Sequence, residues 1–281
     1  MIAPHDGSSL YYSLLWTQPT ARINFLKRLT LIHALSSSLD DVHEPTVAEK
    51  KIHWWHEELE RLAKSTPRHP ACKENKELMQ GKQIAIRHCL SILSSAASTR
   101  YTQSQTDAEA NELLLSSFKS RIALLSDALH HVQADADDTP NTTNREALNN
   151  QTIQADDLAL AFAIHDNLYR LPYLLHRGFA VFSDETYDKH SLTPETLSTE
   201  GAKTILEEAI NHALSCFDSA FSDESLCSVL QQRAHLPLWR LTKLRAAQCK
   251  LWQRQGTRLV SERATLTPIR KFYIAWRHRR H

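Results

Sequence analysis

The chain has 281 residues, of which 42% are hydrophobic and 23% charged, and its formal net charge is +1 at pH 7. This length and composition suit one globular unit with a single large core, and the near-zero charge argues against general attraction to nucleic acid. Five glycines and the absence of G-x-G-x-x-G and G-x-x-x-x-G-K leave no support for Rossmann or P-loop nucleotide sites. Five cysteines without a C-x-x-C pair predict reduced core thiols.

Apolar residues recur at three- and four-residue spacing along most of the chain, which predicts an all-α protein. In chain order we expect helices over 20–41, from 46 through 59, and over 73–98, 107–133, 152–175, 201–221, 224–255 and 267–279. The polar stretch 135–150 predicts a surface loop, and only 178–182 resembles a strand, too isolated to build a sheet. The sequence therefore predicts one helical domain over residues 1–281.

Three carboxylates lie at the end of the first predicted helix. Asp40 and Glu44 are one turn apart on one face, and Asp41 is beside them. The helix dipole disfavours an exposed negative charge at this end by about 0.3–1 kcal/mol each, which suggests that a cation neutralises them. Oxygen ligands of this type suit Mg²⁺. From spacing alone, a solvated acidic turn leading into the next helix remains the alternative interpretation.

The C-terminal segment 267–281 combines cations with aromatic side chains. Its cations include Arg270, Arg277 and Arg279, and its aromatics include Phe272 and Trp276. A basic amphipathic helix of this kind suits a membrane surface, and an ordinary solvated last helix is the alternative. The chain starts without the basic and apolar regions of a signal peptide, and it has no run of about 18 apolar residues. We expect a cytoplasmic protein, in solution or peripheral at a membrane.

Several short elements carry a resemblance to a known family. In chain order they are Tyr11-Tyr12, Pro19-Thr-Ala-Arg22, Leu39-Asp40-Asp41-Val-His-Glu44-Pro45, Trp55-His-Glu-Glu58-Leu59, Pro67-Arg-His-Pro70, His176-Arg177-Gly178 and Leu266-Thr-Pro268. Together they resemble the squalene/phytoene synthase family. The resemblance implies an isoprenoid-synthase-like bundle of antiparallel helices around a central cavity. In that family two acidic motifs hold Mg²⁺ against two prenyl diphosphates, which are condensed head to head.

The resemblance also implies which residues form the site. It assigns the metal to Asp40, Asp41 and Glu44, and the diphosphates to Tyr11, Tyr12, Arg22, Asn167, Arg170 and Arg177. The family's second motif reads approximately N-x-x-R-D-x-x-E-D, whereas this chain has Asn167-Leu-Tyr-Arg170-Leu171-Pro172-Tyr-Leu-Leu. All of its acids are missing, so Mg²⁺ is expected through the first motif only. Pro172 is expected to kink or end the helix.

Two functions remain open at this point. The first is a catalytically impaired member that binds a prenyl lipid or a protein partner, as complex I assembly factors of this fold do; Arg170-Leu-Pro172-Tyr resembles that branch. The second is a Mg²⁺-dependent prenyl-diphosphate transferase that uses Asp40, Asp41 and Glu44 for the metal, with Arg22 and Arg170 near phosphate. Asp156 and Asp157, further upstream, are better read as a cap of their helix than as replacements for the lost ligands. The missing acids favour the first function, because a diphosphate in a dry cavity without its cation is very costly.

Overall fold

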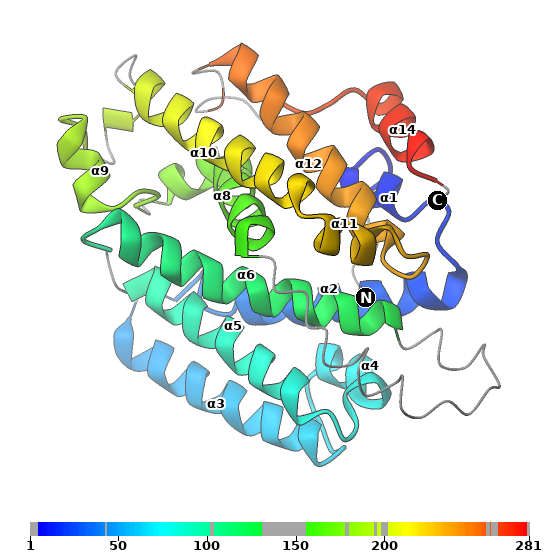
Figure 1. The fold of residues 1–281 in the computed structure, drawn as a ribbon. Coiled ribbons are helices and arrows are strands. Elements are labelled where there is room, and N and C mark those ends of the chain that lie inside the picture. Colours follow the sequence, from blue (N-terminus) through cyan, green and yellow to red (C-terminus); the bar gives the residue numbers. More distant parts are fainter. Residues whose placement is uncertain are drawn as a thin grey trace.

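The computed structural model describes residues 5–42, 44–101, 104–130, 156–177, 180–193, 196–197, 202–256, 259 and 264–279. Within these ranges the regular structure is helical throughout, as predicted, and no strand occurs (Figure 1). The α-helices are α1 (Ser9–Ser13), α2 (Pro19–Ser36), α3 (Pro45–Ala63), α4 (Pro70–Met79), α5 (Gln83–Tyr101), α6 (Asp107–His130), α8 (Asp156–His176), α9 (Asp184–Lys189), α10 (Ala202–Ser222), α11 (Glu224–Gln231), α12 (Leu236–Gln255) and α14 (Pro268–Arg277). The predicted loop over 135–150 lies outside the described residues.

Proline marks where several helices begin. It occupies the first turn of α2, α3, α4, α12 and α14, where its missing N–H has no intrahelical partner to lose. This explains one error of prediction: the single helix expected over 224–255 divides into α11 and α12, and Pro237 lies at the start of the second. The helix expected over 73–98 likewise divides into α4 and α5, because Gly81 between them has a φ of 74°.

One other prediction about a helix end is wrong, and one of the two outcomes expected at Pro172 is excluded. The first long helix ends at Ser36 rather than at Asp41, within a run of serines. The N–H of Ser37 still bonds the carbonyl of His33, but the N–H of Ser38 bonds the carbonyl of Leu35, three residues back, so the α-helical pattern stops within the serines. Pro172, by contrast, does not end its helix, since α8 continues to His176. Leu168 and Leu171 are buried on this helix, and their packing outweighs the proline.

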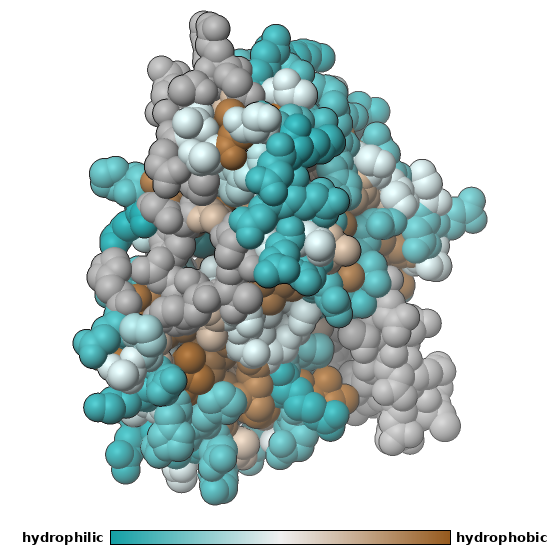
Figure 2. Space-filling view, turned by 90° about the vertical axis from the view of Figure 1, so that its left-hand side faces the viewer, coloured by the Kyte–Doolittle hydropathy of each residue, from teal (hydrophilic) through white to brown (hydrophobic). Residues whose placement is uncertain are grey.

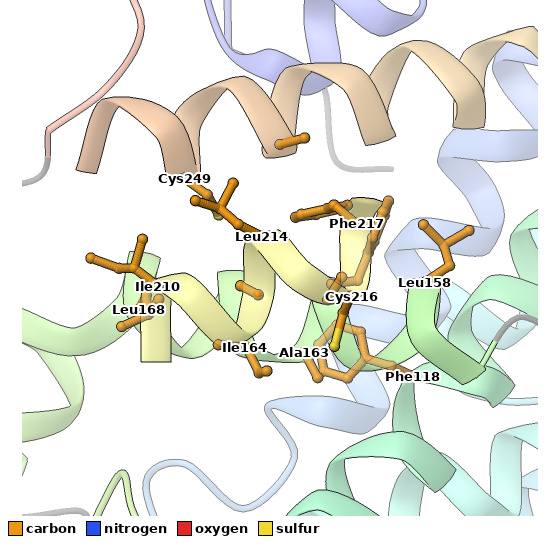
Figure 3. Packing of buried hydrophobic residues seen from close by; sticks show 14 of the residues in the cluster. Phe118, Leu158, Ala163, Ile164, Leu168, Ile210, Leu214, Cys216, Phe217 and Cys249 are labelled. Carbon is orange, nitrogen blue, oxygen red and sulfur yellow. The ribbon is translucent and has the colours of Figure 1, made fainter. Parts of the chain in front are cut away.

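The helices form two halves that share α6. The N-terminal half consists of α2, α3, α4 and α5 with one side of α6, and its core includes Phe25, Leu59 and Leu125. The C-terminal half packs α8, α10, α11 and α12 against the other side of α6. Figure 3 shows this second cluster, in which Phe118 of α6 and Phe217 of α10 belong to one continuous apolar core. Helix α6 therefore forms the central wall of the bundle.

The remaining features of the molecule concern its surface and its thiols. Hydrophilic side chains cover much of the described part of the face in Figure 2, with apolar side chains showing between them. No described helix is both long and apolar enough to cross a membrane. All five cysteines are unpaired, and all except Cys227 are buried, as expected for core thiols. Burial raises the pKa of Cys89 to about 12, so this thiol stays protonated and unreactive.

Candidate functional site

A cavity of about 150 Å³ lies where the end of α2 meets α5, α6 and α8. Its polar lining includes Asp40, Arg121, Asp166 and Arg170, and its apolar lining includes Leu113, Leu114, Val181 and Phe182. A second cavity of about 270 Å³ extends between α6, α8 and α10. The two cavities share Ala110, Leu114, Asn167, Val181 and Phe182. They therefore form adjoining parts of one hollow beside the central helix α6.

Both carboxylates that line the first cavity have an arginine partner. Asp40 follows α2, and its Oδ2 lies 3.5 Å from Nη2 of Arg170 on α8. Asp166, one turn before Arg170, lies 3.9 Å from Nη1 of Arg121 on α6. The two acids thus approach the cavity from opposite walls, and each meets a guanidinium rather than the other acid. Sequence reasoning predicted roles for Asp40 and Arg170 but not their pairing.

The other two carboxylates of the predicted first motif point elsewhere. Asp41 is largely exposed and pairs with Arg177, with 3.2 Å between Oδ1 and Nη2. Glu44 precedes α3 as its N-cap residue and accepts a 2.8 Å hydrogen bond from the hydroxyl of Thr46. Because α2 ends at Ser36, Asp40 and Glu44 do not share a helical face, which corrects the prediction. Neither Asp41 nor Glu44 lines either cavity.

The residues expected near diphosphates are only partly brought together. Asn167 lines both cavities and Arg170 lines the first. Tyr11 and Tyr12 lie on α1, which packs against α12 and α14, and they line neither cavity. Arg22 is in the first turn of α2. At about 1.5 Å rise per residue it lies roughly 20 Å from the end of that helix, and so from Asp40.

The described residues do not fit a resident magnesium ion. They contain no group of three His, Cys, Asp or Glu side chains that could hold a metal. Leu171, at a position where the family motif has an acid, is fully buried. Asp156 pairs with Lys119 at 2.6 Å and Asp157 accepts from Ser219, so neither replaces a ligand at the cavity. The donors that magnesium needs are either absent or already occupied by guanidinium groups.

Sequence reasoning missed three charged residues beside the cavity. Arg121 interrupts the apolar side of α6, and burial lowers the pKa of its guanidinium. Arg245 of α12 lies 4.2 Å from the ring centroid of Phe162, and burial lowers its pKa as well. Asp166, four residues before Arg170, was recognised as part of the helix but not as a cavity residue. Arg121 and Arg170 balance the charges of Asp40 and Asp166 in the first cavity, whereas two further acids, Asp107 and Glu208, line the second cavity. In the sequence, the signal that could have identified Arg121 was a single arginine on an otherwise apolar face of a helix.

Comparison with known proteins sets this geometry in context. The squalene/phytoene synthase family model matches residues 3–269. The chain belongs to the squalene/phytoene synthase family. Squalene synthase HpnC from Alicyclobacillus acidocaldarius is 14% identical with a TM-score of 0.64, over 87% of this chain and 88% of that one. A dehydrosqualene synthase solved in complex with a ligand is 11% identical with a TM-score of 0.67, over 96% and 95%.

These structures confirm the all-α isoprenoid synthase fold of this squalene/phytoene synthase family member. At such low identities they show the shared fold alone. No curated protein sequence gave a match. In this family member, arginines pair with the two acids that line the first cavity.

Proposed function

We propose that this protein is a non-catalytic member of the squalene/phytoene synthase family that binds one prenyl or related lipid without magnesium. The observation that carries the proposal is the pairing of both carboxylates of the first cavity with arginines, Asp40 with Arg170 and Asp166 with Arg121. Ionisation of an allylic diphosphate needs cations that neutralise the leaving group, and free carboxylates to hold them. Here those carboxylates already have positive partners.

Magnesium binding at this cavity carries an energetic cost. To ligate an ion, Asp166 must leave Arg121, whose Nε has no hydrogen-bond partner in the described structure. The side chains of Arg121 and Asp166 are 21% and 27% exposed, so water screens the pair and its loss costs about 1–3 kcal/mol. The side chains of Leu171 and Leu174 have no oxygen atom that could bind the ion and offset this cost. The cavity therefore favours its internal pairs over a metal.

The size and lining of the cavities match a single apolar ligand. The volumes of about 150 and 270 Å³ are each below the 300–1,000 Å³ usual for small-molecule pockets, and together they reach the lower part of that range. Two prenyl diphosphates side by side need far more room. Leucines, Val181 and Phe182 suit a hydrocarbon chain, and the acids Asp107 and Glu208, which line the second cavity, suit a head group with little negative charge.

One observation favours a second candidate, a Mg²⁺-dependent prenyl-diphosphate transferase. Asp40, Asp166 and Asn167 line the same cavity, and all three carry oxygen atoms of the kind that bind magnesium. In this candidate a diphosphate displaces the acids from Arg121 and Arg170, and the freed carboxylates hold the ions. The two candidates therefore differ in whether Asp40 and Asp166 are needed for turnover.

The decisive experiment measures turnover and binding in parallel. Purified protein is incubated with farnesyl or geranylgeranyl diphosphate, with and without Mg²⁺, and assayed for pyrophosphate and condensed hydrocarbon. We expect no turnover, but binding of about one farnesol or farnesyl monophosphate per chain that does not depend on Mg²⁺. Turnover that is lost in both Asp40→Asn and Asp166→Asn would establish the transferase instead.

A cavity-filling variant tests whether the ligand occupies the predicted space. Ala110 lines both cavities, so Ala110→Phe should fill their junction and abolish lipid binding. Ala108 is exposed on the same helix, so Ala108→Phe is the matched control and should bind normally. Equal binding by both variants would place the ligand outside the cavity and contradict the proposal.

A further inference from the structure

The last described helix, α14, turns its apolar side toward solvent. Ile269, Phe272, Tyr273 and Trp276 are 83%, 46%, 55% and 40% exposed. Their spacing of three and four residues places them on one stripe, about 100° wide at about 100° per residue. The opposite side of the helix buries Lys271 and Ala275. This is the reverse of an ordinary surface helix, whose apolar side faces the core.

A neighbouring element extends the apolar stripe. Trp16, which follows α1, is 39% exposed, and its ring lies 5.8 Å from that of Phe272. Helices α1 and α14 contact each other and the side of α12, at the edge of the bundle (Figure 1). Lys271 ties this arrangement to the N-terminal region by donating a 2.8 Å hydrogen bond to the carbonyl of Gly7. Packing of the opposite side of α14 therefore keeps the apolar stripe facing solvent.

Arginines accompany the stripe. At about 100° per residue, Arg270 and Arg277 follow one edge, and Arg279 comes two residues after the helix ends. No acidic partner within salt-bridge distance is found for these three among the described residues. The guanidinium of Arg279 lies 4.5 Å from the ring centroid of Trp276. An apolar strip bordered by cations that lack acidic partners is the pattern of an interfacial helix.

We propose that α14, together with Trp16, docks this protein onto the surface of a membrane that contains anionic lipid. Aromatic and aliphatic side chains enter the boundary between head groups and acyl chains, while the arginines bind lipid phosphates. Charge argues against a second copy as the occupant. An interface with two-fold symmetry that joins α14 to itself brings equivalent arginines together without an acid between them.

The test is co-sedimentation of the full chain with vesicles of phosphatidylcholine, with or without phosphatidylserine. We expect binding to the anionic vesicles that weakens as salt is added, because salt screens the arginines. Replacing both Arg270→Gln and Arg277→Gln should lower the partition coefficient about thirtyfold, at about fivefold for each cation. Arg254→Gln, at an exposed arginine of α12, is the charge control and should leave binding unchanged.

A matched pair of variants tests the contribution of apolar side chains to vesicle binding. Ile269→Ser should weaken binding about tenfold, since an aliphatic side chain loses its burial in the interface. Ile84 is 62% exposed on α5, so Ile84→Ser controls for loss of a surface isoleucine. Both variants should keep the helical circular dichroism of the parent. Equal binding to neutral and anionic vesicles, or no difference between the two serine variants, would overturn the proposal. So would a dimer in sedimentation velocity that only Ile269→Ser dissociates.

Discussion

Asp127 should be one of the most sensitive positions for stability, because it neutralises a buried arginine. Arg28 of α2 has a fully buried side chain, and its Nη2 lies 2.7 Å from Oδ2 of Asp127 on α6. The same nitrogen donates to the carbonyl of Leu78 at 3.2 Å. Asp127→Asn keeps the shape of the side chain but removes the charge, which leaves the guanidinium buried without a counterion.

The expected loss of unfolding free energy differs between the two partners, because Arg28 is buried and Asp127 is partly exposed. An uncompensated buried charge costs about 3–5 kcal/mol, and that is the expected loss for Asp127→Asn. Arg28→Met should cost less, about 1–2 kcal/mol, because Asp127 is 32% exposed and keeps Lys82 at 2.6 Å. The double variant should therefore be more stable than Asp127→Asn alone, since removing the arginine removes the unpaired charge.

Urea denaturation followed by far-UV circular dichroism measures these differences. The four proteins of the cycle are compared at constant pH and salt, and the midpoints are read together with the slopes. The reasoning is refuted if Asp127→Asn costs less than about 1 kcal/mol. It is also refuted if the double variant is no more stable than Asp127→Asn. Either result would mean that water, and not Asp127, compensates the charge of Arg28.

Three more predictions concern a buried acid, a buried histidine and the metal. Glu58→Gln should lower the unfolding free energy in urea by about 1.5–3 kcal/mol, because Glu58 accepts hydrogen bonds from the N–H groups of Arg68 and His69 at 2.6 Å. Glu57→Gln, at a half-exposed site, should lower it by less than about 0.5 kcal/mol. Burial, with a smaller effect from Arg245, lowers the pKa of His165 well below its usual range. Only the unfolded chain then takes up this proton, so stability should fall below about pH 6.5, by up to 1.4 kcal/mol per unit, and His165→Phe should flatten a pH series of unfolding. Millimolar Mg²⁺ should leave the melting temperature unchanged by calorimetry, and a rise that Asp40→Asn removes would contradict the ion-pair assignment.

The helical fold was predictable from local sequence, and its errors have local causes. Periodicity gave the long helices, because an apolar stripe repeats over several turns regardless of what it packs against. The errors fall at helix ends, where one or a few residues decide: the serines at the end of α2, Gly81 and Pro237. Helix α14 was predicted over 267–279 and found as Pro268–Arg277. Which of its faces is buried could not be read from its sequence, since both faces carry large side chains.

The elements that carried the family resemblance include some that build the scaffold. Glu58, in the Trp55-His-Glu-Glu58-Leu59 element, accepts backbone hydrogen bonds from Arg68 and His69 in the next element. It also accepts from Arg61 at 2.9 Å. Two motifs that are separate in sequence therefore meet in space, and their contact holds the turn between α3 and α4. These motifs therefore identify the family through its fold as much as through its site.

The pairing at the cavity could not be predicted, because it joins residues far apart in the chain. Asp40 and Arg170 are 130 positions apart, and their meeting depends on how α2 ends against α8. The sequence nevertheless contained the decisive change, which is leucine at position 171 where the family motif has an acid. In the structure Leu171 belongs to the core that α8 shares with α10 and α12. This position therefore contributes packing to the core.

Replacement of metal ligands by packing and ion pairs changes what the cavity needs in order to be stable. A site that collects several carboxylates has like charges that repel until a cation binds, so part of its stability depends on that cation. Here Asp40 and Asp166 are each neutralised by an arginine of the same chain, and Leu171 is buried without a polar partner to satisfy. On the proposed function, the hollow needs no added ion. It can then bind an apolar chain without ionising a diphosphate, because the two properties rest on different residues: the leucines, Val181 and Phe182 for the first, and metal-binding acids for the second.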